Sequence, residues 1–175
     1  VFLPVVSPDG LANFSAYNRI NQNGPKQMGW RVTAQGLNLN RDFTKLDSPE
    51  LRALTNAFNQ WQPDIFFDTH ATDGADYQYV TTYSIEDFGN YDPAISRWLS
   101  GVWEKRIVPA MARHDMPVTR YIEFDPWGDP TAALSENSFS AMFSESYATA
   151  RNCPGILLET HMLKPYKDRV FSTYY

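Results

Sequence analysis

Three short segments carry side chains whose types suit a binding or catalytic site. Asn40-Arg41 places an amide next to a guanidinium, a pair that can bind a carboxylate in bidentate fashion. His70 closely follows the apolar residues 65–67, and Glu159 directly follows residues 155–158. An imidazole can bind a metal through one nitrogen while a carboxylate holds the other, and a glutamate can act as general base. These segments therefore indicate a candidate catalytic site.

Each of these residues has a simpler interpretation when it is taken alone. A histidine without its context is more often a satisfied surface or core residue than a ligand, and Asn-Arg is common in solvated loops. Glu159 could be an exposed glutamate in a salt bridge, but a carboxylate that follows apolar residues is costly to bury unless it is paired or used. Arg31 lies 40 − 31 = 9 residues before Asn40, so one loop system could present two guanidinium groups to one ligand.

Apolar residues recur at helical spacing in three places. Ser48 followed by Pro49 predicts a helix start, and apolar residues then recur at intervals of 3, 4 and 3 up to position 61. We expect this helix to end near Pro63. A second helix is predicted to begin at Asp92-Pro93, and a closing helix is predicted over residues 164–175.

Short apolar runs between these helices predict strands. The runs are residues 1–6, 65–67, 119–124 and 155–159, with turns expected at Pro8-Asp9-Gly10 and Asp73-Gly74 and a loop at 125–130. Tyr77 and Tyr79 are interpreted as strand aromatics. Alternation of strands with amphipathic helices predicts an α/β domain. In such domains reacting groups gather beyond the carboxyl ends of strands, where His70 and Glu159 are expected to lie.

The composition narrows the class of protein. A chain of 175 residues with 43% hydrophobic residues can bury one core, so we expect a single globular domain over residues 1–175. The net charge of −5 and the absence of a basic run argue against nucleic acid as a partner. No apolar stretch is long enough to span a membrane. Cys153 is the single cysteine, and no feature of the sequence indicates an oligomeric state.

Taken together, the segments resemble the zinc carboxypeptidases of the carboxypeptidase A-like family. The likeness follows one order of residues along nearly the whole chain: Pro8-Asp9-Gly10, Arg31, Asn40-Arg41, His70 and Glu159. It implies a mixed, mostly parallel twisted sheet flanked by helices. It also implies a peptide substrate, bound by its C-terminal carboxylate, and one zinc ion.

The resemblance assigns a role to each matched residue. Arg31 would polarise the scissile carbonyl, and Asn40 and Arg41 would bind the terminal carboxylate. His70 would be the third zinc ligand of a site that carboxypeptidase A builds from two histidines and one glutamate. Glu159 would take a proton from the attacking water and pass it to the leaving amine.

One element of the family pattern is missing. The His-x-x-Glu pair that supplies the other two zinc ligands does not occur, since neither His114 nor His161 has a glutamate three positions later. Residues 1–6 look like a buried strand rather than a signal peptide, so we expect the N-terminus and both ligands to lie upstream of Val1. The 175 residues alone are then expected to show little or no peptidase activity.

Further positions are matched less closely. The substrate-covering tyrosine of the family is assigned to Tyr147, which lies 159 − 147 = 12 residues before Glu159, with Tyr121 as the alternative. Either ring could instead be a core aromatic. His161 shares the strand parity of Glu159 and could support it, or could be an ordinary polar residue. Residues that set side-chain preference are expected between Pro130 and Arg151, and relatives with this arrangement are often secreted or periplasmic.

Two other functions remain open from the sequence. A zinc amidohydrolase of small N-acyl amino acids would reuse the same ligands and glutamate on a small substrate with a free carboxylate. A non-catalytic binding module would keep the carboxylate clamp without a metal. A His-x-x-Glu pair upstream of Val1 would separate the two enzymes from the binding module.

Overall fold

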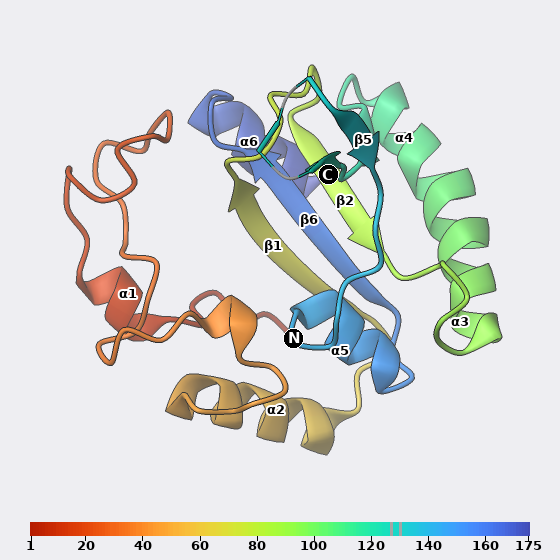
Figure 1. Cartoon of the computed structure of the whole chain (residues 1–175), viewed down its shortest axis with the longest axis horizontal. Coiled ribbons are helices and arrows are strands. Elements are labelled where there is room, and N and C mark those ends of the chain that lie inside the picture. Colours follow the sequence, from red (N-terminus) through yellow and green to blue (C-terminus); the bar gives the residue numbers. More distant parts are fainter. Residues whose placement is uncertain (127, 130) are drawn as a thin grey trace.

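The computed structural model describes residues 1–126, 128–129 and 131–175, and it places a four-stranded sheet between two layers of helices (Figure 1). The spatial order is β1 (Phe66–Thr72), β6 (Gly155–His161), β2 (Thr81–Ile85) and β3 (Val118–Arg120). β1 runs parallel to β6 and β2 runs parallel to β3, while β6 and β2 are antiparallel. This confirms the predicted α/β fold with a mixed, mostly parallel sheet.

One face of the sheet is covered by α2 (Pro49–Trp61) and α5 (Ser144–Ala150). Phe58 of α2 packs with Ala148, Cys153 and Phe66 of β1 in one hydrophobic cluster. Successive residues of a strand point to opposite faces, so Asp68 and His70 share the face of Phe66. The short 3-10 helix η1 (Leu39–Arg41) joins this layer through Leu39, which packs with Phe43 and Leu51.

The opposite face is covered by one long helical run and by the C-terminal helix. The run consists of α3 (Pro93–Trp98), the π-helix η2 (Leu99–Ile107) and α4 (Val108–Arg113). Leu99 and Trp103 pack on Tyr83, Ile85 and Ile156 in the second core cluster. The C-terminal helix α6 (Tyr166–Tyr174) is tied to this face by a 2.6 Å hydrogen bond between the hydroxyls of Ser172 and Thr81.

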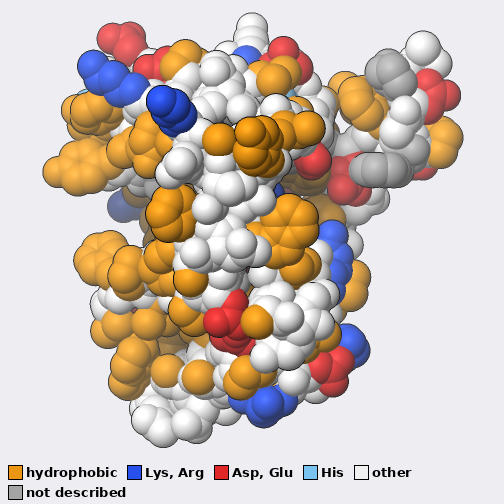
Figure 2. Space-filling view, turned by 90° about the vertical axis from the view of Figure 1, so that its left-hand side faces the viewer, with side chains coloured by type: hydrophobic (Ala, Val, Ile, Leu, Met, Phe, Trp, Pro, Cys, Tyr) orange, Lys and Arg blue, Asp and Glu red, His pale blue; other side chains and the backbone are white. Residues whose placement is uncertain are grey.

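The remaining elements are short. α1 (Pro8–Ala12) lies in the mostly irregular N-terminal segment, which is coloured red to orange in Figure 1. β4 (Glu123–Asp125) and β5 (Ala133–Ser135) form a separate antiparallel pair. Figure 2 shows hydrophobic side chains spread over the side of the molecule that bears the N-terminal segment. None of the helices in the described ranges combines the length and apolar character needed to cross a bilayer.

The helix starts were predicted well because their signals are local. Ser48 accepts a hydrogen bond from the backbone N–H of Leu51 at 3.2 Å, and Pro49 is the first residue of α2. Asp92 likewise caps α3, which begins at Pro93. The helix predicted to end near Pro63 ends at Trp61, and the closing helix predicted over residues 164–175 is α6.

The N-terminal strand and the first turn were predicted wrongly. Residues 1–6 form no strand, and Val1 and Phe2 are almost fully exposed. A short apolar run forms a strand only beside a partner, and no described strand pairs with it. Pro8-Asp9-Gly10 is not a turn but the start of α1, because Ser7 accepts from the N–H of Gly10 as an N-cap.

The predicted strand over residues 119–124 is divided between two sheets. β3 ends at Arg120, and the hydroxyl of Tyr77 accepts from the N–H of Ile122 and donates to its carbonyl. The Tyr77 hydroxyl thus takes the hydrogen bonds that a neighbouring strand would make with Ile122. The chain here leaves the main sheet and enters β4. Tyr77 and Tyr79 lie in the loop between β1 and β2, not in a strand as predicted. Of the predicted 125–130 loop, Trp127 and Pro130 lie outside the described residues.

Candidate active site

His70 and Glu159 lie side by side on the neighbouring strands β1 and β6. β1 and β6 are parallel and in a register that pairs His70 directly with Glu159. The Nδ1 atom of His70 lies 3.5 Å from Oε1 of Glu159. The structure therefore brings together the predicted zinc ligand and the predicted general base, on the face covered by α5.

Asp68 holds the other nitrogen of the His70 ring. Its Oδ2 atom lies 2.8 Å from Nε2 of His70, two residues later on the same strand. Burial alone would lower the pKa of His70, but the hydrogen bond and charge of Asp68, with the charges of Glu159 and Glu145, raise the pKa to about 9. The metal-free imidazole is therefore protonated at neutral pH, and a metal ion bound at Nδ1 would displace a proton.

Two further buried carboxyl groups shape the electrostatics of the site. Burial, together with the charges of Asp68 and Glu145, raises the pKa of Glu159 to about 7, although His70 and Arg31 act in the opposite direction. Burial and the charges of Glu86 and Asp68 raise the pKa of Glu145, also to about 7. One carboxylate oxygen of Glu159 and one of Glu145 are buried with no hydrogen-bond partner among the described residues. A carboxyl with a pKa near 7 can both take up and release a proton at neutral pH.

The first turn of α5 lies beside the Asp68–His70 pair. Burial would raise the pKa of Asp68, but His70 and, to a smaller extent, the Ser144 side chain lower it below its usual value. α5 can come this close because residue 155 is a glycine, whose absent Cβ would stand 2.1 Å from the backbone oxygen of Glu145. A sequence reading could have found Asp68 from its strand parity with His70, but nothing local marks Glu145.

Arg31 lies near the C-terminal end of β1. With Arg19, Trp30, Ala71 and Asp73 it lines a hollow of about 440 Å³ beside the end of β1. Its charge acts on Glu159 and lowers the pKa of that residue. Burial and the neighbouring charge of Arg31 also lower the pKa of Arg19, while Asp73 raises it. The structure thus adds a second guanidinium, Arg19, which the sequence did not single out.

Asn40 and Arg41 lie in η1 on the same face as α5. The guanidinium of Arg41 stacks over the ring of Phe143 at 4.4 Å, and one of its N–H groups donates to the Asn40 carbonyl. The Asn40 side-chain oxygen is buried without a partner in the described chain. Phe143 directly precedes Ser144, so the N-terminus of α5 connects the predicted clamp to the Asp68–His70 pair.

The loop that carries Asn40 and Arg41 is held in place by hydrogen bonds to Asp42. Asp42, the residue after Arg41, accepts hydrogen bonds from the Ser48 hydroxyl at 2.7 Å, the Ser48 N–H at 2.8 Å and the Asp47 N–H at 2.9 Å. Burial raises the pKa of Asp42, but these hydrogen bonds outweigh it and leave the pKa below its usual value. The cap of α2 therefore also fixes the position of Arg41.

The two tyrosines considered from the sequence have different surroundings. The ring of Tyr147 packs against Phe43 and Phe58, with centroid distances of 5.4 and 5.9 Å, in the core beneath α5. Burial together with the charges of Glu123 and Glu159 raises the pKa of Tyr121 to about 12.

His161 supports the surrounding loops. It is buried, and its Nδ1 accepts from the N–H of Leu163 while Nε2 lies 3.2 Å from the Gly74 carbonyl oxygen. Both ring nitrogens are therefore used by backbone groups that follow β6 and β1. The contacts of His161 therefore support these two loops.

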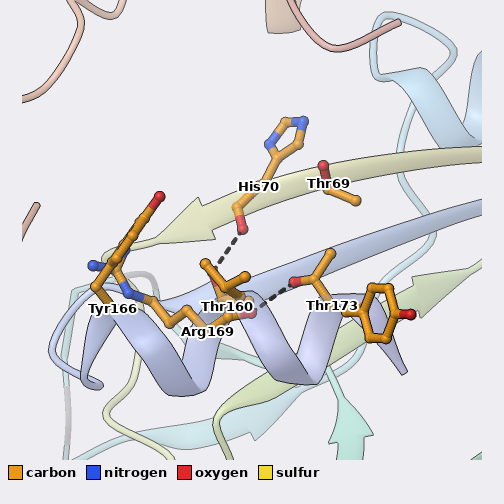
Figure 3. A pocket seen from close by; sticks show the side chains of 8 residues that line it. Thr69, His70, Thr160, Tyr166, Arg169 and Thr173 are labelled. Atoms are coloured by element: carbon orange, nitrogen blue, oxygen red, sulfur yellow. Dashed lines mark hydrogen bonds between the residues drawn. The ribbon is translucent and has the colours of Figure 1, made fainter. Parts of the chain in front are cut away.

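A second hollow lies on the far side of the sheet. It has a volume of about 380 Å³ and is lined by Thr69, Thr160, Arg169 and other residues of α6. Figure 3 shows the His70 ring pointing away from α6, so His70 borders this hollow with its backbone. The carbonyl of His70 there accepts from the Thr160 hydroxyl at 3.0 Å. The hollow does not belong to the candidate site.

The donor atoms of the chain fit part of a zinc site. Asp68 fixes the His70 ring so that Nδ1 faces Glu159, the arrangement in which a carboxylate orients a ligating imidazole. Within residues 1–126, 128–129 and 131–175, no group of three or more His, Cys, Asp or Glu side chains is placed to hold a metal ion. The described chain can thus supply one imidazole ligand and its supporting carboxylate.

Comparison with known proteins finds similarity in structure. Neither a protein-family model nor a curated protein sequence matches the chain. The fold resembles a metallo-carboxypeptidase from Burkholderia cenocepacia with a TM-score of 0.56 and 17% identity, over 79% of this chain and 33% of that one. A proposed carboxypeptidase from Burkholderia mallei matches with a TM-score of 0.55 and 21% identity, over the same shares of the two chains. A proposed carboxypeptidase A from Shewanella denitrificans matches with a TM-score of 0.53 and 18% identity, over 83% of this chain and 39% of that one.

These similarities show the class of fold. The chain has a carboxypeptidase-like α/β fold and spans between a third and two fifths of the length of the structures that it matches.

Proposed function

We propose that this chain is part of the catalytic domain of a zinc-dependent carboxypeptidase, which removes residues from the C-termini of peptides. The observation that carries the proposal is the pairing of His70 with Glu159 in adjacent parallel strands, with Asp68 on the far side of the imidazole. The shared fold with metallo-carboxypeptidases supports the same reaction class.

Asn40 and Arg41 would bind the terminal carboxylate of the substrate. The planar guanidinium of Arg41, which lies over the Phe143 ring, presents N–H groups that can meet two carboxylate oxygens. Only one of the Arg41 donors is used within the described chain, by the Asn40 carbonyl. A site that requires a free carboxylate acts on chain ends, which makes the enzyme an exopeptidase.

Glu159 would act as general base and then as general acid. Its pKa of about 7 lets it take a proton from the attacking water and return it to the leaving amine near neutral pH. Arg31, whose charge already acts on Glu159, would stabilise the oxyanion that develops on the scissile carbonyl. Tyr147 would cover the substrate, with Tyr121 as the alternative.

A bound zinc ion would polarise the scissile carbonyl and make the attacking water more acidic. His70 would hold the ion through Nδ1, with Asp68 fixing the ring, and two further ligands would come from a His-x-x-Glu pair outside this chain. The resemblance also leads us to propose secretion or a periplasmic location, which cell fractionation would test.

The proposal is tested by the substrate preference of the full-length protein loaded with zinc. We expect release of the last residue from peptides with a free C-terminus and none from the same peptides amidated at that end. Hydrolysis of N-acyl amino acids in place of peptides would make the protein an amidohydrolase. Binding of free carboxylates with no hydrolysis of either substrate would make it a binding module, and both results would overturn the proposal.

A further inference from the structure

We propose that Arg169 of α6 is a positioning residue for Arg31. It anchors the loop of residues 16–27, which leads toward Arg31, to the chain that directly follows β6, the strand of Glu159. The inference rests on the proposed function, because it takes Arg31 as the group that stabilises the oxyanion. It adds a residue on the opposite face of the sheet to those that the reaction depends on.

The loop is closed at its base. The backbones of Ser15 and Met28 exchange two hydrogen bonds, each 3.0 Å long. Arg31 follows shortly after Met28, and the N–H of the intervening Trp30 donates to the Gly10 carbonyl at 2.7 Å. The loop and Arg31 therefore belong to one connected unit of hydrogen-bonded backbone.

The tip of the loop is fastened to the chain that follows β6. The N–H of Asn23 donates to the Met162 carbonyl at 2.8 Å, and its side-chain amide donates to the Leu163 carbonyl at 3.1 Å. Arg169 supplies the third contact, since its Nη2 donates to the carbonyls of Asn23 at 2.9 Å and Gly24 at 2.5 Å. Because Met162 and Leu163 come directly after β6, these contacts fix the loop tip relative to the end of that strand.

Arg169 is a buried cation whose contacts point to this anchoring role. Only 7% of the residue is exposed, and burial lowers the pKa of its guanidinium. Its Nη2 bonds to the loop, while its Nε has no partner in the described part of the chain. Figure 3 shows the side chain beside Tyr166, whose ring centroid lies 5.6 Å from the guanidinium carbon. A buried guanidinium is costly unless its donors are used, so the two loop carbonyls are the partners that stabilise it there.

The anchored loop and Arg31 line the same hollow. This hollow of about 440 Å³ is lined in part by Arg19, Asn21 and Gln22 of the loop and by Arg31. The charge of Arg31 acts from there on Glu159. A group that stabilises an oxyanion works only when it is well placed, and a misplacement of about 1 Å can cost about 10²-fold in rate. Release of the loop tip would therefore displace the wall beside Arg31 and reduce its effect on the reaction.

The test is a double-mutant cycle on the full-length protein loaded with zinc, with kcat and KM measured for release of the C-terminal residue of a peptide. Arg169→Met should lower kcat about tenfold and leave KM within about twofold of the wild-type value, because Arg31 would act in the transition state. In the Arg31→Ala background the same change should have little further effect, since the residue through which Arg169 acts is absent. Lys167→Met removes an exposed cation from the same helix and should leave both constants unchanged.

The outcomes separate this inference from the proposed function. An equal loss of kcat from Arg169→Met in both backgrounds would overturn the inference and leave the proposed peptidase standing, as would an unchanged kcat in the single variant. No release of the C-terminal residue by the wild-type protein would disprove the proposed function and with it this inference. If Arg169→Met does not fold, the cycle is run with Asn23→Ala, an exposed residue whose side chain supplies one of the same anchors. A cost that is equal in both backgrounds, or no cost, then decides against the proposal.

Discussion

The Nε2 atom of His70 lies 2.8 Å from Oδ2 of Asp68, and this hydrogen bond turns the other ring nitrogen toward Glu159. The two residues are two positions apart on β1, so the pleat itself places them on one face of the strand. Asp68 therefore decides which nitrogen of His70 is available to a metal.

The first prediction follows from this contact. Asp68→Asn should lower the zinc affinity of the full-length protein roughly 10–100-fold, because the carboxylate orients the ligating ring and raises its basicity. Competition with a chromogenic chelator measures the affinity. Asp64→Asn, an exposed aspartate just before β1, is the matched control and should leave the affinity unchanged. Equal affinities for the Asp68 variant and the wild type would show that Asp68 does not support a ligand.

Glu145 should make the folded protein less stable as pH rises. Burial raises its pKa in the folded state to about 7, above the ordinary value of 4.5. Because the pKa of Glu145 is higher in the folded state, its contribution to stability is complete below about pH 4.5 and is lost as pH rises through about 7. Glu145→Gln mimics the protonated form, so it should increase the free energy of unfolding by about 1–3 kcal/mol at pH 8 and change it little at pH 5. Denaturant unfolding at both pH values checks this, and an equal gain at both would contradict the assignment.

Gly155 should be required for the approach of α5 to the sheet. A Cβ at this position would meet the Glu145 carbonyl oxygen at 2.1 Å, a contact that only movement of α5 could relieve. We expect Gly155→Ala to destabilise the protein by about 2–4 kcal/mol and to displace the first turn of α5, as in other overpacked sites. Gly101→Ala provides the control, because nothing lies within 4 Å of its added methyl group. Thermal unfolding of both variants decides the point, and equal melting temperatures would refute it.

The parts of the fold predicted from sequence are those with local causes. Ser48-Pro49 and Asp92-Pro93 begin helices because the capping side chain and the fixed φ of proline act within one turn. Residues 1–6 were predicted as a strand from the same kind of local evidence. That prediction was wrong because a strand depends on a partner that local sequence does not specify.

The residues of the candidate site likewise fall into those with a local sequence signal and those without one. His70 and Glu159 were found because each follows an apolar run, and the sheet brings the two runs side by side. Their roles, and those of Arg31, Asn40 and Arg41, stay predictions. Glu145 and Glu86 could not be found, because their proximity to the site depends on how α5 folds back onto the sheet. The ring of Tyr147 packs against Phe43 and Phe58, and its role as the substrate-covering tyrosine stays a prediction.

The central claim is that Glu159 moves the proton in a zinc-dependent hydrolysis, and one variant tests it most directly. In the full-length protein loaded with zinc, Glu159→Gln should reduce kcat for release of the C-terminal residue by about 10²–10⁴-fold, while metal analysis shows one zinc ion still bound. Peptide hydrolysis at the wild-type rate in this zinc-loaded variant would contradict the account.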